Sequence, residues 1–380
     1  MKKIKIKSAH LTRIGALSAG YRTTTMDAVR GVLSTADLDR VSDTYIASYA
    51  PAELCRIADP FREVTQAMQT EFPALRATHH GMFKTGGEAL YRALSDMSRG
   101  GEGDVLVIGS EKMTRVGTAE AAGILSCRES PHDCAYGATL PALGALVTRA
   151  YLSRHRVPES ALHRVSVKNH RNGAINPRAH FQTEVTLDEV ASSPLVADPL
   201  RRLHCAPLSD GAAAVLLGFG RGKVAFIGWG EGRDTAMFQE RCDISSFPAA
   251  ARASEAARAM AGVALDDVDV VEIHDAFSSF ELINLEAMGF YAPGTAWRSL
   301  EAGDLEIGGR RAVNPSGGMK ARGHPVGATA LTGAAEMVDQ LTGCAGVRQQ
   351  RGARVGMIQS VGGVSSECYV FVLDVSEEKP

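Results

Sequence analysis

The sequence has no long apolar run and no excess of charge of either sign. No stretch of its 380 residues is apolar for long enough to span a bilayer. Lysine and arginine total 41, aspartate and glutamate total 43, and the net charge is −2. Without a basic run, nucleic acid and anionic membranes are not favoured as partners. The basic segment 1–7 predicts a first strand rather than a signal peptide, so we expect a cytoplasmic protein.

The sequence also has no C-x-x-C pair, and its cysteine count is odd at seven. Both observations argue against a disulfide framework and against a zinc site. We therefore expect buried or idle thiols in a reducing compartment. The cysteines are Cys55, Cys127, Cys134, Cys205, Cys242, Cys344 and Cys368.

What is present is the composition of a globular protein with a large core, because 45% of the residues are hydrophobic and 22% are charged. Apolar strand-like runs alternate with helical patterns, which predicts an α/β fold with helices covering a sheet. The predicted helices span 83–97 and 328–341, and the predicted strands span 1–7, 104–109, 212–217, 268–273 and 354–358.

The two halves of the chain follow the same plan. Each contains a turn, a buried helix, a short linker and a buried strand, which predicts an internal duplication. The first half spans residues 1–220 and the second spans 221–380. Residues of about 115–195 have irregular spacing and weak periodicity, so we interpret them as a loop subdomain inserted into the first half.

The segment 314–330, NPSGGMKARGHPVGATA, carries the strongest functional signal. Its glycines, Gly318 among them, permit positive φ and close backbone approach, and Asn314 begins the turn. Pro325 suits the start of the helix that follows. His324 is thereby held at a turn entering a helix, where an imidazole can meet a substrate, and we predict that it is functional.

This segment resembles the N-x-x-G-G-x-x-x-x-G-H-P signature of thiolases and matches it at every fixed position. Other segments are similar to the sterol-carrier-protein type of thiolase: GSEKM at 109–113, KNHRN at 168–172 with NP at 176–177, CAPLSDGAAA at 205–214 and VEIHDAF at 271–277. The resemblance covers most of the chain. It implies the thiolase fold, an α/β fold of two similar βαβαβ halves in five αβαβα layers, which usually forms a tight dimer.

The nucleophile of this family is a cysteine at the N-terminus of a buried helix, where the helix dipole favours a thiolate. Thr85, Gly86, Ala89 and Leu90 match the family pattern Cys-Ser-Thr-Gly-x-x-Ala-Leu in order, which places the cysteine position at Phe83. A phenylalanine can neither attack a thioester nor carry an acyl group. The resemblance therefore implies a thiolase-like protein without an acyl-enzyme.

Two further positions that hold sulfur in thiolases are also changed. The cysteine of the family's C-terminal C-x-G segment corresponds to Ser360, and the cysteine that some members place within H-D-x-F corresponds to Ala276. A serine hydroxyl is a poor base at neutral pH without a partner to activate it. The sulfur chemistry of the family is thus missing as a set.

The resemblance leaves in place the groups that polarise a carbonyl. It implies that His274 and His324 line one oxyanion hole, each donating a hydrogen bond to a thioester oxygen. Backbone N–H groups at Phe83 and Gly362 would form a second hole. Donors of this kind contribute on the order of 100-fold in rate.

Other candidate residues carry less weight. We expect His79 and His80 to be a solvated or capping pair, and Glu281 and Glu286 to be surface carboxylates. Asp275 is expected to orient either His274 or a backbone amide. Lysine and arginine side chains of the inserted region are candidates to contact the phosphates of coenzyme A.

Two hypotheses follow for the function. The first is an enzyme that acts on an acyl-CoA or related thioester by acyl transfer, retro-aldol cleavage or decarboxylation, with no covalently bound cofactor and no metal. It resembles thiolase-like aldolases of steroid side-chain degradation in lacking the cysteine, although the retained His324 departs from them. The second is a non-catalytic or half-catalytic subunit, paired with a cysteine-bearing paralogue or a zinc-binding OB-fold partner, in which Phe83 plugs the acyl pocket.

Overall fold

The computed structural model describes residues 3–375, which fold around one ten-stranded mixed sheet. Its strands lie in the order β10-β9-β11-β12-β8-β1-β7-β4-β2-β3. The strands of the first half are β1 (Ile4–Leu11), β2 (Val41–Ala47), β3 (Thr78–Phe83), β4 (Asp104–Glu111) and β7 (Gly211–Gly218). Those of the second half are β8 (Val224–Arg233), β9 (Val270–Glu272), β10 (Ala312–Val313), β11 (Val355–Gly362) and β12 (Glu367–Val375).

The strand order shows the internal duplication directly. In each half, the third strand along the chain lies at the outer edge, followed inward by the second, fourth, fifth and first. The two halves meet where the first strand of each, β1 and β8, pair antiparallel over a short stretch. Identical strand order in two halves without extended sequence identity confirms the repeated plan predicted from the sequence.

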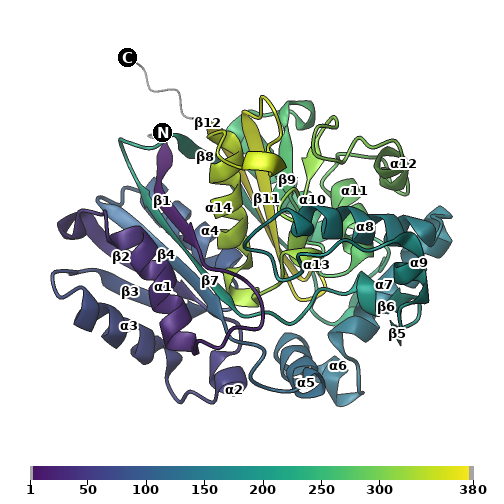
Figure 1. Cartoon of the computed structure of the whole chain (residues 1–380), viewed down its shortest axis with the longest axis horizontal. Helices are drawn as coiled ribbons and strands as arrows, with labels where there is room; N and C mark the ends of the chain where they lie inside the picture. The colour runs from purple at the N-terminus through teal and green to yellow at the C-terminus, as the bar shows by residue number, and fades with distance from the viewer. Residues whose placement is uncertain (1–2, 376–380) are drawn as a thin grey trace.

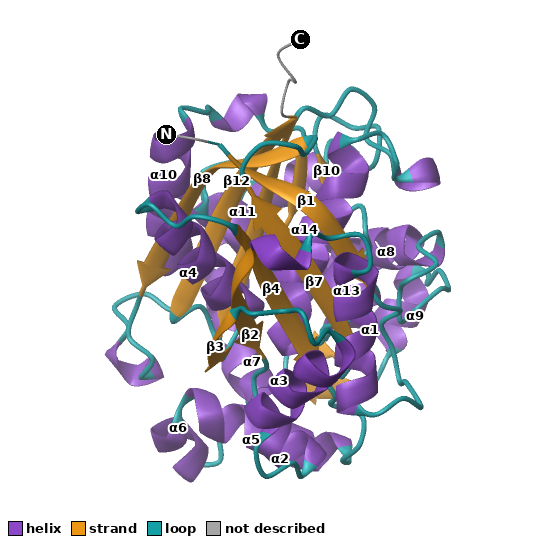
Figure 2. Ribbon diagram, turned by 90° about the vertical axis from the view of Figure 1, so that its left-hand side faces the viewer, coloured by secondary structure: helices purple, strands orange, loops and turns teal. Residues whose placement is uncertain are grey.

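Helices complete a five-layer arrangement (Figures 1 and 2). The helices α4 (Gly86–Ser98) and α14 (Thr329–Leu341) pack against each other and against strands of both halves, so they form the central layer. The outer layers are α1 (Tyr21–Leu33) and α3 (Pro60–Glu71) on the first half, and α10 (Pro248–Ala261) and α11 (Ser278–Ala287) on the second. The predicted αβαβα fold class is confirmed.

The inserted region is more regular than its sequence suggested. It consists largely of helices: α5 (Thr118–Glu129), α6 (Pro131–Ala135), α7 (Leu140–His155), α8 (Ser160–Ala174) and α9 (Leu187–Ser192). A two-stranded sheet follows, formed by β5 (Leu195–Ala197) and β6 (Leu200–Arg201). The inserted loop subdomain is thus built mainly of helices, because tertiary packing stabilises helices whose own periodicity is weak.

Two local expectations are also corrected. The helix predicted from Phe83 begins at Gly86, because Phe83 pairs with Ala47 at the end of β3 and Thr85 caps the helix by accepting from the N–H of Glu88. Cys127 and Cys134 form a disulfide with Cα atoms 5.2 Å apart. The expectation of idle thiols fails for this pair because the turn between α5 and α6 brings the two cysteines together.

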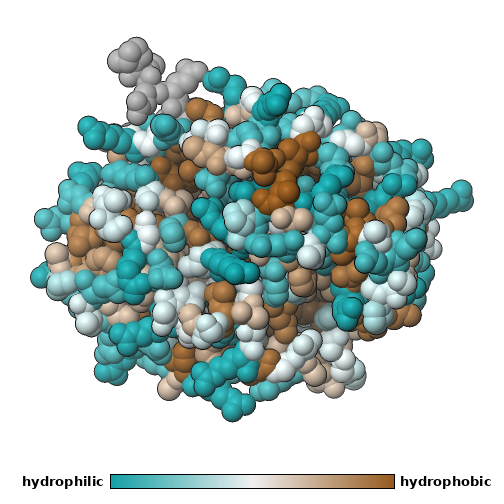
Figure 3. Space-filling model, in the orientation of Figure 1, coloured by the Kyte–Doolittle hydropathy of each residue, from teal (hydrophilic) through white to brown (hydrophobic). Residues whose placement is uncertain are grey.

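The surface is ordinary for a water-exposed protein on the face seen in Figure 3, where hydrophilic side chains dominate and apolar ones lie in small separate groups. Of the helices within residues 3–375, none combines the length and apolarity needed to cross a bilayer.

The remaining short helices are α2 (Pro51–Cys55), α12 (Ala296–Glu301) and α13 (Gly318–Ala321).

Candidate active site

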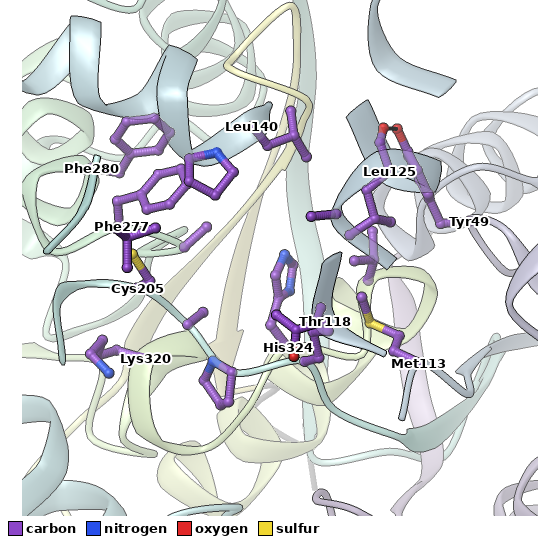
Figure 4. A pocket seen from close by; sticks show the side chains of 18 of the residues that line it. Tyr49, Met113, Thr118, Leu125, Leu140, Cys205, Phe277, Phe280, Lys320 and His324 are labelled. Atoms are coloured by element: carbon purple, nitrogen blue, oxygen red, sulfur yellow. Dashed lines mark hydrogen bonds between the residues drawn. The ribbon is translucent and has the colours of Figure 1, made fainter. Parts of the chain in front are cut away.

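A cavity of about 820 Å³ lies between the inserted helices and the loops that follow strands of both halves (Figure 4). Its walls are mostly apolar, which suits an acyl group. The apolar lining includes Met113, Val116, Leu125, Leu140, Leu203, Leu208, Phe277, Phe280, Val326 and Val364. The titratable side chains on the wall are Tyr49, Arg202, Cys205, His274, Lys320 and His324.

His274 follows the short strand β9 and is held by both backbone and ring. Its carbonyl accepts from Asn284 Nδ2 at 2.9 Å, and its Nδ1 lies 3.3 Å from the N–H of Val361. Because a backbone N–H can only donate, Nδ1 is the acceptor and the ring proton of neutral His274 is on Nε2. His274 therefore presents a hydrogen-bond donor.

His324 is held by a different set of partners. Its N–H donates to Ser209 Oγ at 3.2 Å, and its Nδ1 lies 2.8 Å from Thr329 Oγ1. The Thr329 hydroxyl also lies 3.1 Å from the carbonyl of Pro325, and when it donates there it accepts from Nδ1–H of the histidine. In that tautomer, Nε2 of His324 has a free lone pair and can accept a hydrogen bond.

The two imidazoles meet edge to face, with ring centroids 5.2 Å apart and planes at 88°. Burial, with His324 as the second cause, holds the pKa of His274 well below its ordinary value. Burial, followed by the charge of Arg322, lowers the pKa of His324 to about 4. Both rings are therefore neutral at pH 7. In these tautomers the pair offers one donor and one acceptor, whereas the family resemblance implies two donors.

The turn around His324 is supported by buried polar groups. Asn314 has φ of 52°, and its Oδ1 accepts from the N–H of Ile273 at 2.8 Å. Gly318 has φ of 59°, and a Cβ there would lie 2.4 Å from Asp275 Oδ2. Asp275 accepts from the N–H of Met319 at 2.6 Å, so it orients backbone amides rather than the His274 ring.

The expectation for the two glutamates of α11 was wrong, because both are buried. Glu281 accepts from Asn314 Nδ2 at 2.8 Å and pairs with Lys168 Nζ at 3.2 Å. Glu286 accepts from Tyr151 Oη at 2.7 Å and from backbone N–H groups of the loop that follows. Both carboxylates lie on a helix whose residues 278–286 are all buried. It packs against α7 and α8 of the insertion and against α10 and α12, and the sequence of one helix does not reveal such neighbours.

The structure brings together only part of the predicted constellation. His274, His324, Ala276 and Gly362 line the cavity, whereas Phe83 is absent from its described lining.

The Phe83 ring stacks on Tyr45 with centroids 5.9 Å apart, and it is not among the residues that line the cavity. Ser360 is buried behind the wall, where its Oγ would lie 2.6 Å from a Cβ placed on Gly87.

The histidine pair at 79 and 80 also lies away from the cavity. Both side chains are half-buried on β3, where His79 Nδ1 lies 2.6 Å from Thr44 Oγ1 and His80 Nε2 lies 2.8 Å from Asp43 Oδ1. Hydrogen bonds to the neighbouring strand, rather than solvation or capping, account for this pair.

Sequence reasoning missed three residues of the wall. Cys205 lies in the motif at 205–214 and Lys320 in the motif at 314–330, but the sequence indicated no role for either. Arg202 follows the insertion, which spans about 115–195. Burial raises the pKa of the Cys205 thiol to about 11, so it is protonated at neutral pH and does not replace the missing nucleophile. For Lys320, the signal available was a lysine within the glycine array that holds His324.

His204, which precedes Cys205 in the chain, is expected to make the stability of the fold depend on pH. His204 is fully buried against His163, and burial lowers its pKa to about 3, far below the value near 6.5 expected in the unfolded chain. The unfolded state therefore binds the proton first, so this stability is complete above pH 6.5 and is lost as the pH falls below it.

We expect this one group to lower the free energy of unfolding by about 1.4 kcal/mol per pH unit below the unfolded pKa. Urea unfolding at a series of pH values in wild type and His204→Gln measures it. The variant is expected to show a shallower slope, and equal slopes would contradict the assignment.

Within residues 3–375, no group of three or more histidine, cysteine, aspartate or glutamate side chains is arranged to hold a metal ion.

The family models that match this chain and the proteins most similar to it in sequence indicate the same family. The model described as "Thiolase, N-terminal domain" matches residues 6–219, and the one described as "Thiolase C-terminal domain-like" matches 230–375. An acetyl-CoA acetyltransferase of Methanothermobacter thermautotrophicus is 38% identical over 76% of this chain and 77% of its own length. Human sterol carrier protein 2 is 33% identical over 73% of this chain but only 54% of its own length.

Solved structures share the fold at low identity. The "Ltp2-ChsH2(DUF35) aldolase" superposes with a TM-score of 0.82 at 20% identity, covering 100% of this chain and 99% of that one. Human mitochondrial 3-ketoacyl-CoA thiolase superposes with a TM-score of 0.73 at 15% identity, covering 99% of both chains.

Proposed function

The chain belongs to the thiolase superfamily, and we propose that it makes or breaks a carbon–carbon bond beside the carbonyl of an acyl thioester without forming an acyl-enzyme. The observation that carries this proposal is the complementary pair of neutral histidines on one apolar cavity, with His274 as donor and His324 as acceptor. A donor can hold a developing enolate oxygen while the acceptor moves a proton.

In the cleavage direction, the substrate is a 3-hydroxyacyl thioester. Nε2 of His324 takes the proton of the 3-hydroxyl group, the bond between C2 and C3 breaks, and the oxygen becomes a carbonyl. The bonding electrons pass to C2 and the thioester oxygen, where Nε2–H of His274 stabilises the enolate. His324 then returns the proton to C2, so the products are a carbonyl compound and a shorter acyl thioester.

This mechanism uses no thiolate, which agrees with phenylalanine at position 83 and a protonated Cys205. The apolar lining excludes water and strengthens each hydrogen bond to the reacting oxygen. The structural neighbour "Ltp2-ChsH2(DUF35) aldolase" is named as an aldolase, and the proposed reaction is of that class.

The proposal is tested by incubating the purified chain with 3-hydroxyacyl-CoA thioesters that have linear, branched or ring-bearing acyl groups. Mass spectrometry is expected to detect the shorter acyl-CoA and the carbonyl compound in equal amounts. The reverse reaction is tested with the same carbonyl compound and acyl-CoA. If no thioester is converted in either direction, alone or with a partner, the proposal is wrong.

A separate prediction concerns the activity and stability of a variant at position 83. Because the Phe83 ring packs on Tyr45 and not in the cavity, Phe83→Ala is expected to change kcat/KM by less than about threefold. The loss of a half-buried aromatic contact is expected to lower the free energy of unfolding by about 1–2 kcal/mol. Kinetics and urea unfolding of the same preparation measure both quantities.

Phe277→Ala is the matched control for this substitution, because Phe277 lines the cavity and its loss is expected to raise KM. A loss of turnover in Phe83→Ala that exceeds the loss in Phe277→Ala would place position 83 in the active site after all.

The assembly is a further part of the proposal. The edge strand β3 leaves its outer side unpaired in the monomer, which supports pairing with a second copy. A complex with a zinc-binding OB-fold partner or a cysteine-bearing paralogue is the alternative assembly. Light scattering of the purified chain and co-purification from the native host discriminate between them. If a complex keeps full activity after both histidines are replaced, the chain is a non-catalytic subunit.

A further inference from the structure

Lys320 is a fully buried lysine on the wall of the cavity. It lies in the short helix α13, within the glycine array that holds His324. Its Nζ lies 3.4 Å from Nε2 of His170 and 5.8 Å from the centroid of the Phe181 ring, which also lines the cavity. The proposed mechanism does not use this amine.

The neighbour of Lys320 is a neutral acceptor and not a counter-ion. Nδ1 of His170 lies 3.2 Å from the carbonyl oxygen of Thr183, so Nδ1 carries the proton and Nε2 accepts from the lysine. Burial lowers the pKa of His170 to about 4, which keeps the ring neutral. His170 therefore satisfies one N–H of Lys320 without supplying an opposite charge.

Burial lowers the pKa of Lys320 to about 8, whereas the charges of Cys205 and Asp275 act to raise it. Among the side chains described in residues 3–375, no carboxylate oxygen forms an ion pair with Lys320 within 4 Å. Asp275 is the acidic group near it, but its oxygens accept from Asn169 Nδ2 and from the N–H groups of Met319 and Lys320. A buried ammonium without a partner is costly, so a ligand group that pairs with it is strongly favoured.

The placement of Lys320 separates it from the reacting end of the cavity. Figure 4 shows Lys320 and His324 apart on the wall, with Lys320 on the same side as Cys205 and Phe277. The exposed Arg202 also lines the cavity, and it is better suited than a fully buried lysine to meet phosphates that stay in water.

We propose that Lys320 binds a carboxylate carried by the acyl group, so that the cavity prefers thioesters of dicarboxylic acids or of other acids with a second carboxyl group. The inference rests on the proposed function, because it assumes that the thioester carbonyl lies at His274 and His324. It adds that the acyl group is apolar along its length and anionic at the end remote from the thioester.

The test measures binding by calorimetry for a series from adipyl-CoA to sebacyl-CoA, each against the straight-chain acyl-CoA of the same length. Wild-type protein is expected to bind at least one dicarboxylic member about 30-fold or more tightly than its monocarboxylic match. Lys320→Met keeps the length of the side chain without its charge and is expected to abolish this preference. Arg202→Met is the control, expected to weaken both members of a pair alike.

The outcomes separate this inference from the function on which it rests. If thioesters bind but no dicarboxylic member is preferred by wild-type protein, the inference is wrong and the proposed function stands. If no thioester binds at all, the proposed function fails first. Equal weakening of free CoA and of both thioesters in Lys320→Met would assign the lysine to the CoA moiety and overturn the proposal. So would a mass gain after borohydride treatment with a ketone, because it would show an imine at Lys320.

Discussion

Replacing His324 by alanine is expected to lower kcat/KM for carbon–carbon cleavage by about 10²–10⁴-fold. The reason is that Nε2 of this ring is the acceptor in the proposed mechanism, in which Nδ1–H donates to Thr329. Without it, no neutral base is held beside the thioester carbonyl. Steady-state kinetics with the best substrate of the thioester series measure the loss.

A second substitution at the same position separates a base from a merely polar contact. Glutamine in place of His324 can hydrogen-bond but cannot take up a proton, so His324→Gln is expected to be as inactive as His324→Ala. His132→Ala removes an exposed histidine outside the cavity lining and is expected to leave kcat/KM unchanged. Recovery of activity in His324→Gln would contradict the role of base.

The pH dependence of wild-type activity is an independent test of His324 as the base. The active form of His324 is neutral, and its pKa is lowered to about 4 by burial and then by Arg322. Activity is therefore expected to stay level near neutral pH and to fall only as the pH approaches about 4, rather than near 6.5 as for an unperturbed histidine.

The second large effect is expected at His274, where alanine should lower kcat by about 10²–10³-fold with little change in KM. In the proposed mechanism its Nε2–H donates to the oxygen on which charge develops, because Nδ1 accepts from the N–H of Val361. A donor of this kind stabilises the enolate more than the starting thioester, so the loss appears in kcat. Kinetics at saturating and limiting substrate separate the two constants.

Glutamine at this position is expected to have the opposite outcome from glutamine at 324. The amide N–H₂ of His274→Gln can reach the place of Nε2–H, so partial recovery of kcat relative to His274→Ala is expected. Recovery at 274 together with none at 324 would establish that one ring donates and the other accepts. Recovery at neither position would show that the donor role of His274 is wrong.

Much of the architecture followed from the sequence. The alternation of apolar strands with helical segments predicted an α/β fold, and the repeated plan of the two halves is matched by the identical strand order in each. These features are local, because they depend on side-chain periodicity and on turn residues within one segment. The inserted helices were missed for the same reason, since their order comes from packing rather than from their own pattern.

The sequence by itself determined that His324 is held in a glycine-rich turn and that positions 83, 276 and 360 carry no sulfur. Only the tertiary structure decided the hydrogen-bond partners on which the imidazole tautomers depend, Val361 for His274 and a threonine hydroxyl for His324. It also decided that Phe83 packs on Tyr45 and that Lys320 is buried on the cavity wall. These properties arise from contacts between segments far apart in the chain, and no pattern within one segment encodes them.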